Sequence, residues 1–318
     1  MRTALSAVAF GVSLACACQF ASAQTVTVTQ QGYGNTSSTE QIGLTPPSDA
    51  LVGVNVTITQ VGDNNHVGGP GAAHSGVLQR DNRFGGTLAV VEQYGSGNNA
   101  GITQDGTYGN RGAFAATITQ RGTFNDATIR QNIAQMAPAT IEQNGTGNLA
   151  RVEQMFSVDT GVRATQNGTG NQLTVTQVGA TFYGPDLTQN GDRNSISVYS
   201  QSSPAGRPTI LQTGTMNSAS TNQTGGFDAD ITIGQLGTAN RVEASQDGEA
   251  HRASFDQNGS NNLASVTQSG NLLPVTASTA LIAQLGNSNT AIVRQFGEGY
   301  VANVNQTGSG NWANIYQH

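Results

Sequence analysis

The chain has 318 residues, of which 36% are hydrophobic and 10% are charged, and it contains 41 glycines. So few apolar residues exclude a large hydrophobic core. The chain is therefore either disordered or ordered by polar groups that form hydrogen bonds at regular intervals. The formal net charge of −6 argues against a nucleic-acid partner, and no stretch beyond residue 23 is apolar enough for insertion into a membrane.

Residues 1–23 have the pattern of a secretory signal peptide. A basic residue precedes an apolar stretch, and Ala21-Ser22-Ala23 is a small-residue cleavage site. A lipoprotein anchor at Cys16 is the alternative interpretation. Cleavage would remove both cysteines, Cys16 and Cys18, so we expect an exported chain that begins near Gln24 and has no disulfide.

The rest of the chain repeats one pattern, Gln-x-Gly-x-x-Asn. Two copies read IEQNGTGNLARVEQ at residues 141–154 and ATQNGTGNQLTVTQ at residues 164–177, and the period is close to 23 residues with a few insertions. The first glutamines of the twelve copies are Gln30, Gln60, Gln93, Gln120, Gln143, Gln166, Gln189, Gln212, Gln235, Gln257, Gln284 and Gln306. A second glutamine follows each, usually eleven residues later: Gln41, Gln79, Gln104, Gln131, Gln154, Gln177, Gln201, Gln223, Gln246, Gln268, Gln295 and Gln317.

Apolar and polar residues alternate on both sides of each first glutamine. Ala139 and Ile141 lie on the predicted inner face before the turn, and Ala150 and Val152 continue it afterwards, while Arg151 points outward. A period of two indicates a strand with one buried face. The glycines and asparagine between the two stretches are typical of a tight turn, so each repeat is predicted to be strand, turn, strand.

Stacking of the repeats would pair every backbone group and align equivalent side chains in ladders. We therefore predict an all-β fold, a β-solenoid of twelve strand-turn-strand repeats over residues 24–318, stacked as a cross-β core. Inward glutamines and asparagines can donate to one neighbour and accept from the other, so their burial carries little cost. Insertions at about 42–56, 66–78, 105–115 and 269–280 are expected to project sideways, because their prolines cannot donate within a ladder.

The inward amides are the residues that we expect to carry stacking and self-assembly. They are Gln30, Asn35, Gln60, Gln93, Asn98, Gln104, Gln120, Asn125, Gln131, Gln143, Asn148, Gln154, Gln166, Asn171, Gln177, Gln189, Asn194, Gln212, Asn217, Gln223, Gln235, Asn240, Gln246, Gln257, Asn262, Gln268, Gln284, Asn289, Gln295, Gln306, Asn311 and Gln317.

The consensus Gln-x-Gly-x-x-Asn-x-Ala-x-x-x-Gln resembles the repeat of the curlins, the subunits of bacterial curli fibres. It occurs almost unaltered at residues 143–154, 257–268 and 306–317, and in looser form across about residues 24–318. The resemblance implies a secreted amyloid subunit that polymerises with itself into extracellular fibres of a Gram-negative bacterium for biofilm formation and cell adhesion. It also implies a minor curlin nucleator and the curli secretion machinery as partners.

The chain departs from the curlin pattern at one corner of the repeat. The family has serine six residues before the first glutamine, and Ser278 matches it, whereas Thr87, Ala137 and His251 occupy that place in other copies. Which kind of residue fills this position in each stacked repeat is left open. The first strand also begins at once with TVTVTQ, where the known subunits have a non-repeat leader that guides export.

The remaining sequence motifs do not predict a catalytic site or a metal site. The stretch from Gly95 to Ala100 resembles a dinucleotide fingerprint but lies in a turn with no long helix after it. The histidines, His66, His74, His251 and His318, show no spacing of metal ligands. We therefore expect no catalytic residue, no metal and no cofactor, and we do not expect an enzyme.

Three further interpretations stay open at this point. Trp312 and Tyr316 lie on the outward face of the last strand, where they either reflect strand propensity or form a docking face for another subunit. A solenoid adhesin that never polymerises would use the same core. Outward threonines such as Thr117 and Thr119 would suit an ice-binding solenoid, although Glu142 interrupts that array.

Overall fold

The structure is a computed structural model in which all regular elements of the described residues are strands. The described ranges are residues 25–42, 54–69, 74–81, 87–107, 114–203, 206–225, 227–270 and 276–318. The predicted signal peptide at residues 1–23 lies outside them, as do the central parts of the predicted insertions.

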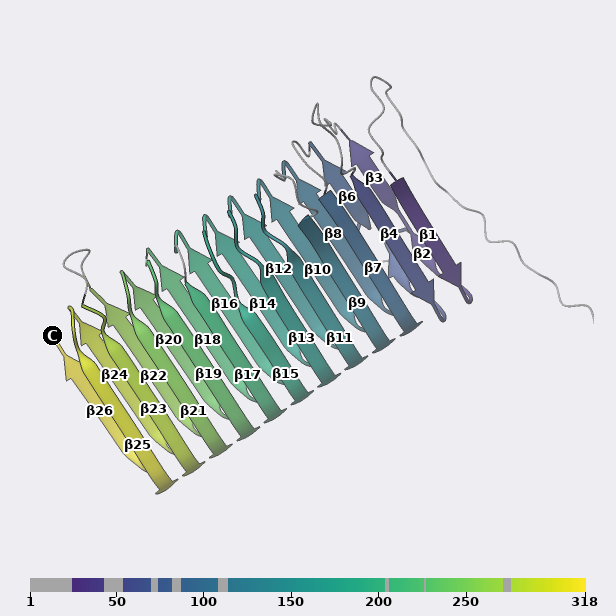
Figure 1. Cartoon of the computed structure of the whole chain (residues 1–318). Helices are drawn as coiled ribbons and strands as arrows, with labels where there is room; N and C mark the ends of the chain where they lie inside the picture. Colours follow the sequence, from purple (N-terminus) through teal and green to yellow (C-terminus); the bar gives the residue numbers. More distant parts are fainter. Residues whose placement is uncertain are drawn as a thin grey trace, which may run out of the picture.

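The strands form two parallel sheets that face each other and run the length of the molecule, from β1 to β26 (Figure 1). The 12-stranded sheet contains β1 (Thr25–Gln31), β4 (Asn55–Val61), β7 (Thr87–Ser96), β9 (Phe114–Thr123), β11 (Ala139–Thr146), β13 (Val162–Thr169), β15 (Asp186–Asp192), β17 (Arg207–Thr215), β19 (Asp230–Thr238), β21 (Arg252–Ser260), β23 (Thr279–Asn287) and β25 (Val301–Ser309). The 14-stranded sheet contains β2 (Thr36–Ser37), β3 (Thr39–Ile42), β5 (His66–Val67), β6 (Val77–Arg80), β8 (Asn99–Asp105), β10 (Asp126–Asn132), β12 (Leu149–Met155), β14 (Gln172–Val178), β16 (Ser195–Gln201), β18 (Ser218–Thr224), β20 (Arg241–Asp247), β22 (Leu263–Ser269), β24 (Thr290–Phe296) and β26 (Trp312–Gln317).

Each repeat contributes one rung, with its first strand in one sheet and its second strand in the other. The register places equivalent residues side by side, so Gln143 pairs with Gln166 and Gln154 pairs with Gln177. Every pairing between strands is parallel, which requires the chain to leave one rung and enter the next in the same direction. The predicted β-solenoid of strand-turn-strand repeats is confirmed.

The core between the sheets is thin and made of small and branched apolar residues. Ala139, Ile141, Ala150 and Val152 are buried as their parity predicts, while the outward Arg151 is exposed. The same positions are filled by Ala, Val, Ile or Leu in most other rungs. The core therefore consists of continuous aliphatic columns, flanked by the columns of amides described below.

A column of glycines makes the first turn of every rung possible. Gly168 has a φ of +116°, and a Cβ on it would lie 2.1 Å from the carbonyl oxygen of Gly191 in the next rung. The glycine two residues later is less constrained, because Gly170 has a φ of +65° and its Cβ would meet only the side chain of Arg193 at 3.6 Å. Non-glycine residues such as Arg193 and Met216 occupy that second place in other repeats.

The insertion in the second repeat leaves the 14-stranded sheet after β5 and returns to it at β6. His74 from this insertion lies against Gly101 of β8, and its Nε2 contacts the carboxylate of Asp126 and the hydroxyl of Thr128, the latter at 3.2 Å. Gln79 consequently reaches the same column as the other second glutamines despite its greater distance from Gln60 in sequence.

We expect Gly168→Ala to lower the free energy of unfolding by more than about 2 kcal/mol, because it adds backbone strain to a contact that no L residue can make. Gly170→Ala is the matched control and should cost about 1 kcal/mol. Urea unfolding of both variants measures the difference. Equal losses for the two variants would contradict the close approach of the turns.

Candidate functional site: amide ladders with two open ends

The first glutamine of every repeat lies in one unbroken column between the sheets. Each side-chain Nε2 donates to Oε1 of the equivalent glutamine one repeat later, at 2.6–3.0 Å. The members from Gln60 onward are buried. This column, the first glutamine column, contains Gln30, Gln60, Gln93, Gln120, Gln143, Gln166, Gln189, Gln212, Gln235, Gln257, Gln284 and Gln306.

The second amide hydrogen of these glutamines ties the two sheets together. Gln143 Nε2 also donates to the backbone carbonyl of Asp126 at 3.0 Å, and Gln166 Nε2 donates to that of Leu149 at 3.0 Å. An unsatisfied buried polar group costs about 1–3 kcal/mol, so this second bond removes a penalty at each rung. The column stabilises the fold only as long as the rungs stay in register.

The asparagines form a second column, in which the bonds from one asparagine to the next run in the opposite direction. Asn148 Nδ2 and its backbone N–H both donate to Oδ1 of Asn125 in the preceding rung, each at 3.1 Å, and Nδ2 also donates to the carbonyl of Gly168 at 2.9 Å. The column contains Asn35, Asn65, Asn98, Asn125, Asn148, Asn171, Asn194, Asn217, Asn240, Asn262, Asn289 and Asn311.

Asn65 is a member that the sequence reasoning missed. It follows Gln60 by five residues, the same spacing that separates Gln143 from Asn148, so the signal was present in the sequence. Its Oδ1 accepts from the backbone and side chain of Asn98 at 3.2 and 3.0 Å. The asparagine column is therefore continuous through the second repeat.

The second glutamines form a third column, which is broken at one rung. Bonds of 2.7–3.0 Å join Gln41, Gln79, Gln104, Gln131, Gln154 and Gln177, and then Gln223, Gln246, Gln268, Gln295 and Gln317. Gln201, the second glutamine of its repeat but not one of the predicted inward amides, lies outside this column, because the register aligns Ser200 with Gln177 and Gln223. Strand parity sets the inward position, and Gln201 lies one residue beyond it on the exposed face.

The break at Ser200 leaves buried polar atoms without hydrogen bonds. Ser200 Oγ, Thr221 Oγ1 and Gln223 Oε1 have no partner within the described part of the chain. Gln177 donates instead to the Thr160 hydroxyl at 2.9 Å. This rung, from β15 to β16, is the weakest part of the third column.

The corner before each first strand is buried, and its occupants differ from rung to rung. Ser278 Oγ donates to the carbonyl of Gly297 at 3.2 Å, and Thr87 and Ala137 are buried in the equivalent place. His251 is 2% exposed there, and neither ring nitrogen has a hydrogen-bond partner among the described residues. Burial lowers the pKa of His251, an effect that Asp247 and Glu298 oppose only in part.

The two ends of the glutamine columns carry different groups. At the first rung, Oε1 of Gln30 and of Gln41 accepts no hydrogen bond from a described residue, since each glutamine donates toward the later repeat. At the last rung, Gln306 and Gln317 each use one amide hydrogen on a backbone carbonyl, and their second hydrogen has no acceptor in the described ranges. Unpaired acceptors thus lie at one end and unpaired donors at the other.

The last strand also carries exposed aromatic residues. Trp312 is 68% exposed and Tyr316 58%, and both lie on the outward face of β26 as expected from their parity. The Tyr316 ring lies 5.7 Å from the ring of Phe296 and 4.9 Å from that of His318, measured between centroids. A docking role for Trp312 and Tyr316 stays a prediction.

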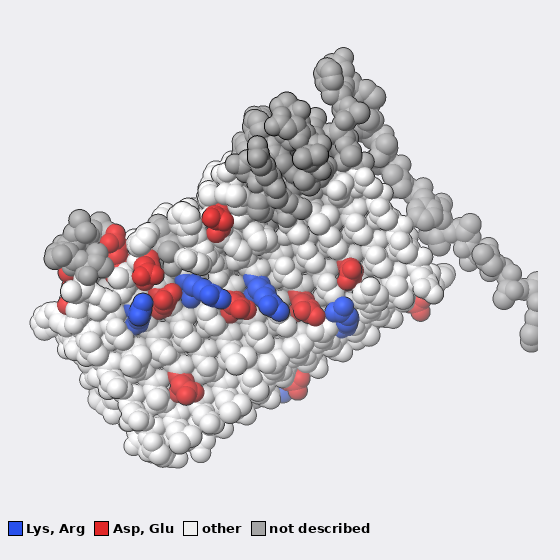
Figure 2. Space-filling model, viewed as in Figure 1, with Lys and Arg blue, Asp and Glu red and all other residues white. Residues whose placement is uncertain are grey.

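Charged residues of alternating sign form a row across the outward face of the 12-stranded sheet (Figure 2). The register places Arg163 beside Asp186 and places Asp230 between Arg207 and Arg252. Opposite charges on neighbouring strands stabilise a sheet, whereas like charges would repel each other at every rung. This charge row consists of Arg121, Glu142, Arg163, Asp186, Arg207, Asp230 and Arg252.

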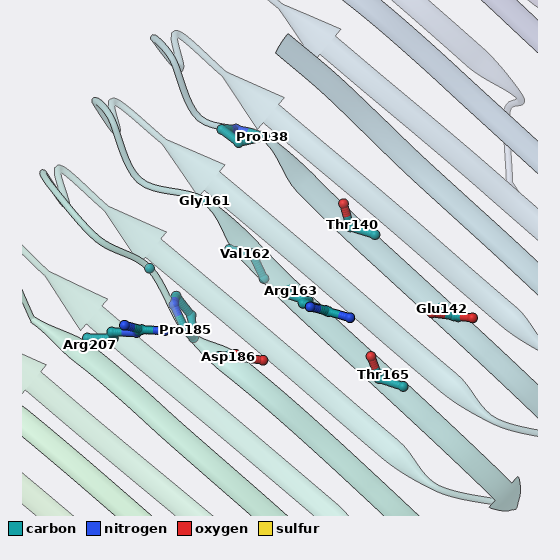
Figure 3. Close-up of a pocket in the computed structure, with 11 residues that line it drawn as sticks. Pro138, Thr140, Glu142, Gly161, Val162, Arg163, Thr165, Pro185, Asp186 and Arg207 are labelled. Atoms are coloured by element: carbon teal, nitrogen blue, oxygen red, sulfur yellow. The ribbon is translucent and has the colours of Figure 1, made fainter.

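An open groove lies beside the charge row, at glycines that precede β13 and β15 and have no side chain to fill the space (Figure 3). Its volume is about 470 Å³, and Gly161, Gly184, Pro138 and Pro185 line it together with part of the charge row. Among the described residues, no group of histidine, cysteine, aspartate or glutamate could hold a metal ion, and there is no helix that could cross a membrane.

Residues 237–270 match the family model of the curlin associated repeat. This segment is therefore similar to a curlin associated repeat. It runs from Gly237, near the end of β19, through β22 and includes members of all three amide columns. The resemblance drawn from the consensus pattern is confirmed there, and no curated protein matches the chain. The match covers this segment of the chain, and the strand-turn-strand rungs on either side of it have the same architecture.

We expect Ser200→Gln to raise the free energy of unfolding by about 1 kcal/mol, because it restores the amide ladder between the Gln177 and Gln223 rungs. Ser197→Gln, on the exposed face of the same strand β16, is the matched control and should change stability by less than about 0.5 kcal/mol. Thermal unfolding compares the two. A loss of stability in Ser200→Gln alone would show that the rung has no room for the longer amide.

His251 should make stability depend on pH. Its pKa is lowered in the folded chain, so the stability that it contributes is present above the unfolded pKa of about 6.5 and is lost as the pH falls through the folded value. His251→Ser supplies the corner serine of the family and should remove this part of the pH dependence. Unfolding of both proteins between pH 7.5 and 5 tests this, and identical pH profiles would contradict it.

Proposed function

We propose that the chain is a secreted structural subunit that assembles end to end into extracellular curli-like amyloid fibres for biofilm formation and cell adhesion. The curlin repeat at residues 237–270 supports a curli-like, extracellular and non-enzymatic role. The observation that carries the proposal is the complementarity of the first and last rungs. A minor curlin nucleator and the curli secretion machinery are the accessory partners that we propose.

The glutamine columns would continue from one copy into the next. The free amide hydrogens of Gln306 and Gln317 at the end of one copy would donate to Oε1 of Gln30 and Gln41 at the start of another. Each contact repeats the geometry found between successive rungs, such as the 2.8 Å bond from Gln284 to Gln306. No rearrangement of the side chains within the column is required.

The asparagine column supports the same direction of growth. Within the chain, each asparagine N–H donates to Oδ1 of the asparagine one rung earlier, as Asn311 does to Asn289 at 3.0 Å. Oδ1 of Asn311 is the acceptor that remains at the last rung, and the backbone N–H of Asn35 is the donor that remains at the first. Neither has a partner within the described ranges.

The strand edges add the largest number of bonds. Within the described ranges, β1 pairs only with β4, whereas β25 pairs only with β23 and β26 only with β24. Exposed edges of this kind template the addition of further strands. Only a head-to-tail contact keeps the strands parallel and places donors against acceptors, and a repeated head-to-tail contact that does not close produces a filament.

A solenoid adhesin that stays monomeric is the competing function. The structure favours it in one respect, because the inner rungs bury their core and satisfy most of their amides without any second copy. An ice-binding face has less support, since Glu142 and Arg163 of the charge row interrupt the outward threonines. The ends of the solenoid are therefore the place to separate the first two functions.

We expect Ile315→Lys to slow fibre growth at least about tenfold, because it places a charge in the core of the last rung, where a second copy would bury it. Asn314→Lys, on the outward face of the same strand, is the matched control and should grow fibres at the rate of the unaltered chain. Thioflavin T fluorescence and electron microscopy of the chain from Gln24, alone and with seeds, measure growth.

Two outcomes would count against the proposal. Fibres that grow equally fast from both lysine variants would rule out the end-to-end contact. A soluble β-rich monomer that forms no fibres after days, even with seeds, would instead support the adhesin.

A further inference from the structure

We propose that the charge row is a self-complementary docking surface through which two copies of the chain bind side by side in antiparallel orientation. This contact uses a face of the solenoid, not its ends, so it does not depend on end-to-end assembly. The partner is a second copy of the same chain, because the order of the charges from Glu142 to Arg252 complements that of a reversed copy.

The row is an unusual concentration of charge on this molecule. Only 10% of the residues are charged, yet every strand from β9 to β21 of the 12-stranded sheet contributes one charged side chain to it. The arginines are exposed and the acids are half-buried. Figure 2 shows the row as a band of alternating sign on an otherwise largely uncharged face.

Most of the charges in the row keep free capacity for a partner. Among the described residues, Arg121 and Glu142 are the members in ion-pair contact, at 3.4 Å. Each of the other guanidinium groups has five N–H donors arranged in a planar fork that suits a carboxylate. Neighbouring members influence one another without direct pairing, since Arg252 and Arg207 partly oppose the rise that burial and Asp228 cause in the pKa of Asp230.

Six members of the row, from Glu142 to Arg252, alternate in sign, and an alternating set with an even number of charges is complementary to its own reverse; Arg121, which pairs with Glu142, lies outside this set. If a second copy faces the row with its direction reversed about a dyad between Asp186 and Arg207, Glu142 meets Arg252, Arg163 meets Asp230, and Asp186 meets Arg207. The dyad repeats each contact, so the interface is isologous. A parallel arrangement in register would instead bring like charges together, and the row therefore selects the antiparallel one.

The surroundings of the row suit a protein partner. The groove of about 470 Å³ beside Arg163 is open and is lined by Glu142, Asp186 and Arg207 of the row itself (Figure 3), so it offers room for charged side chains of the second copy. Leu211 and Leu236 are about half exposed on the same sheet and add apolar surface. Among the described residues, the opposite sheet carries outward charges as separate pairs, such as Arg130 with Glu153, or as single arginines beside threonines, such as Arg151 and Arg294.

Charge complementation between two variants tests the surface. One variant carries Glu142→Gln, Asp186→Asn and Asp230→Asn, which leaves only arginines in the row. The other carries Arg163→Gln, Arg207→Gln and Arg252→Gln, so that Arg121 is its only remaining arginine. Sedimentation velocity at about 0.05 M NaCl, where exposed charges are weakly screened, measures pairing of each variant alone and of their 1:1 mixture.

We expect the unaltered chain to pair, with a dissociation constant that rises at least about tenfold at 0.5 M NaCl. Each variant alone should stay unpaired, and the mixture should pair again. If the row only stabilised its own sheet, both variants would have a lower free energy of unfolding, but mixing them would not restore pairing. Circular dichroism confirms that the variants are folded, and the double variant Arg130→Gln, Glu153→Gln on the other sheet should pair as the unaltered chain does.

Two results would contradict the proposed docking surface. One is that each variant alone pairs as strongly as the unaltered chain, and the other is that the mixture pairs no better than its components. Fibre growth is a separate readout, because both variants retain their end rungs. If fibres form, electron microscopy should show single filaments for each variant and paired filaments for the mixture. If no fibres form, sedimentation still decides the question.

Discussion

Parallel, in-register stacking of buried amides is the constraint on which the rest of the structure depends. A buried glutamine is tolerated only when its oxygen and both amide hydrogens have partners. Here the side chain receives from the rung before, donates to the rung after, and ties the opposite sheet with its second hydrogen. That arrangement requires equal rung height, constant register and a turn tight enough for backbones to touch at the glycine column. Because the buried amides are hydrogen-bonded in this way, the chain folds despite its low content of apolar residues.

The same stacking gives the molecule a direction. The bonds between neighbouring first glutamines all run toward the end of the chain, and the bonds between neighbouring column asparagines all run toward its start, so the two terminal rungs cannot be alike. Repetition also places each outward side chain beside its counterpart about 4.8 Å away. A charge repeated without a change of sign would repel itself along the whole face. Alternation in the charge row relieves this repulsion and, as a consequence, makes its six members from Glu142 to Arg252 complementary to their own reverse.

Where the sequence departs from the repeat, buried polar atoms lose their hydrogen bonds and the amide ladders are weaker. Ser200 leaves a gap in the third column with Gln223 Oε1 unpaired, and His251 puts an ionisable ring where the family has a serine. Both are buried between well-formed rungs, which hold them in place. Such positions are where local opening should begin, since they combine burial with missing hydrogen bonds.

The sequence by itself determined the repeat, the strand parity and most of the amide columns, because a period of two and a spacing near 23 residues are local properties of the chain. The list of inward amides drawn from the sequence lacked Asn65, and the sequence did not show that the register of β16 places Ser200, and not Gln201, in the third column. Only the tertiary structure decided the direction of donation, the burial of His251 and the existence of the charge row. Arg121 follows its glutamine in sequence and Asp186 precedes its own, so these charges become neighbours in one row only when the strands are stacked side by side.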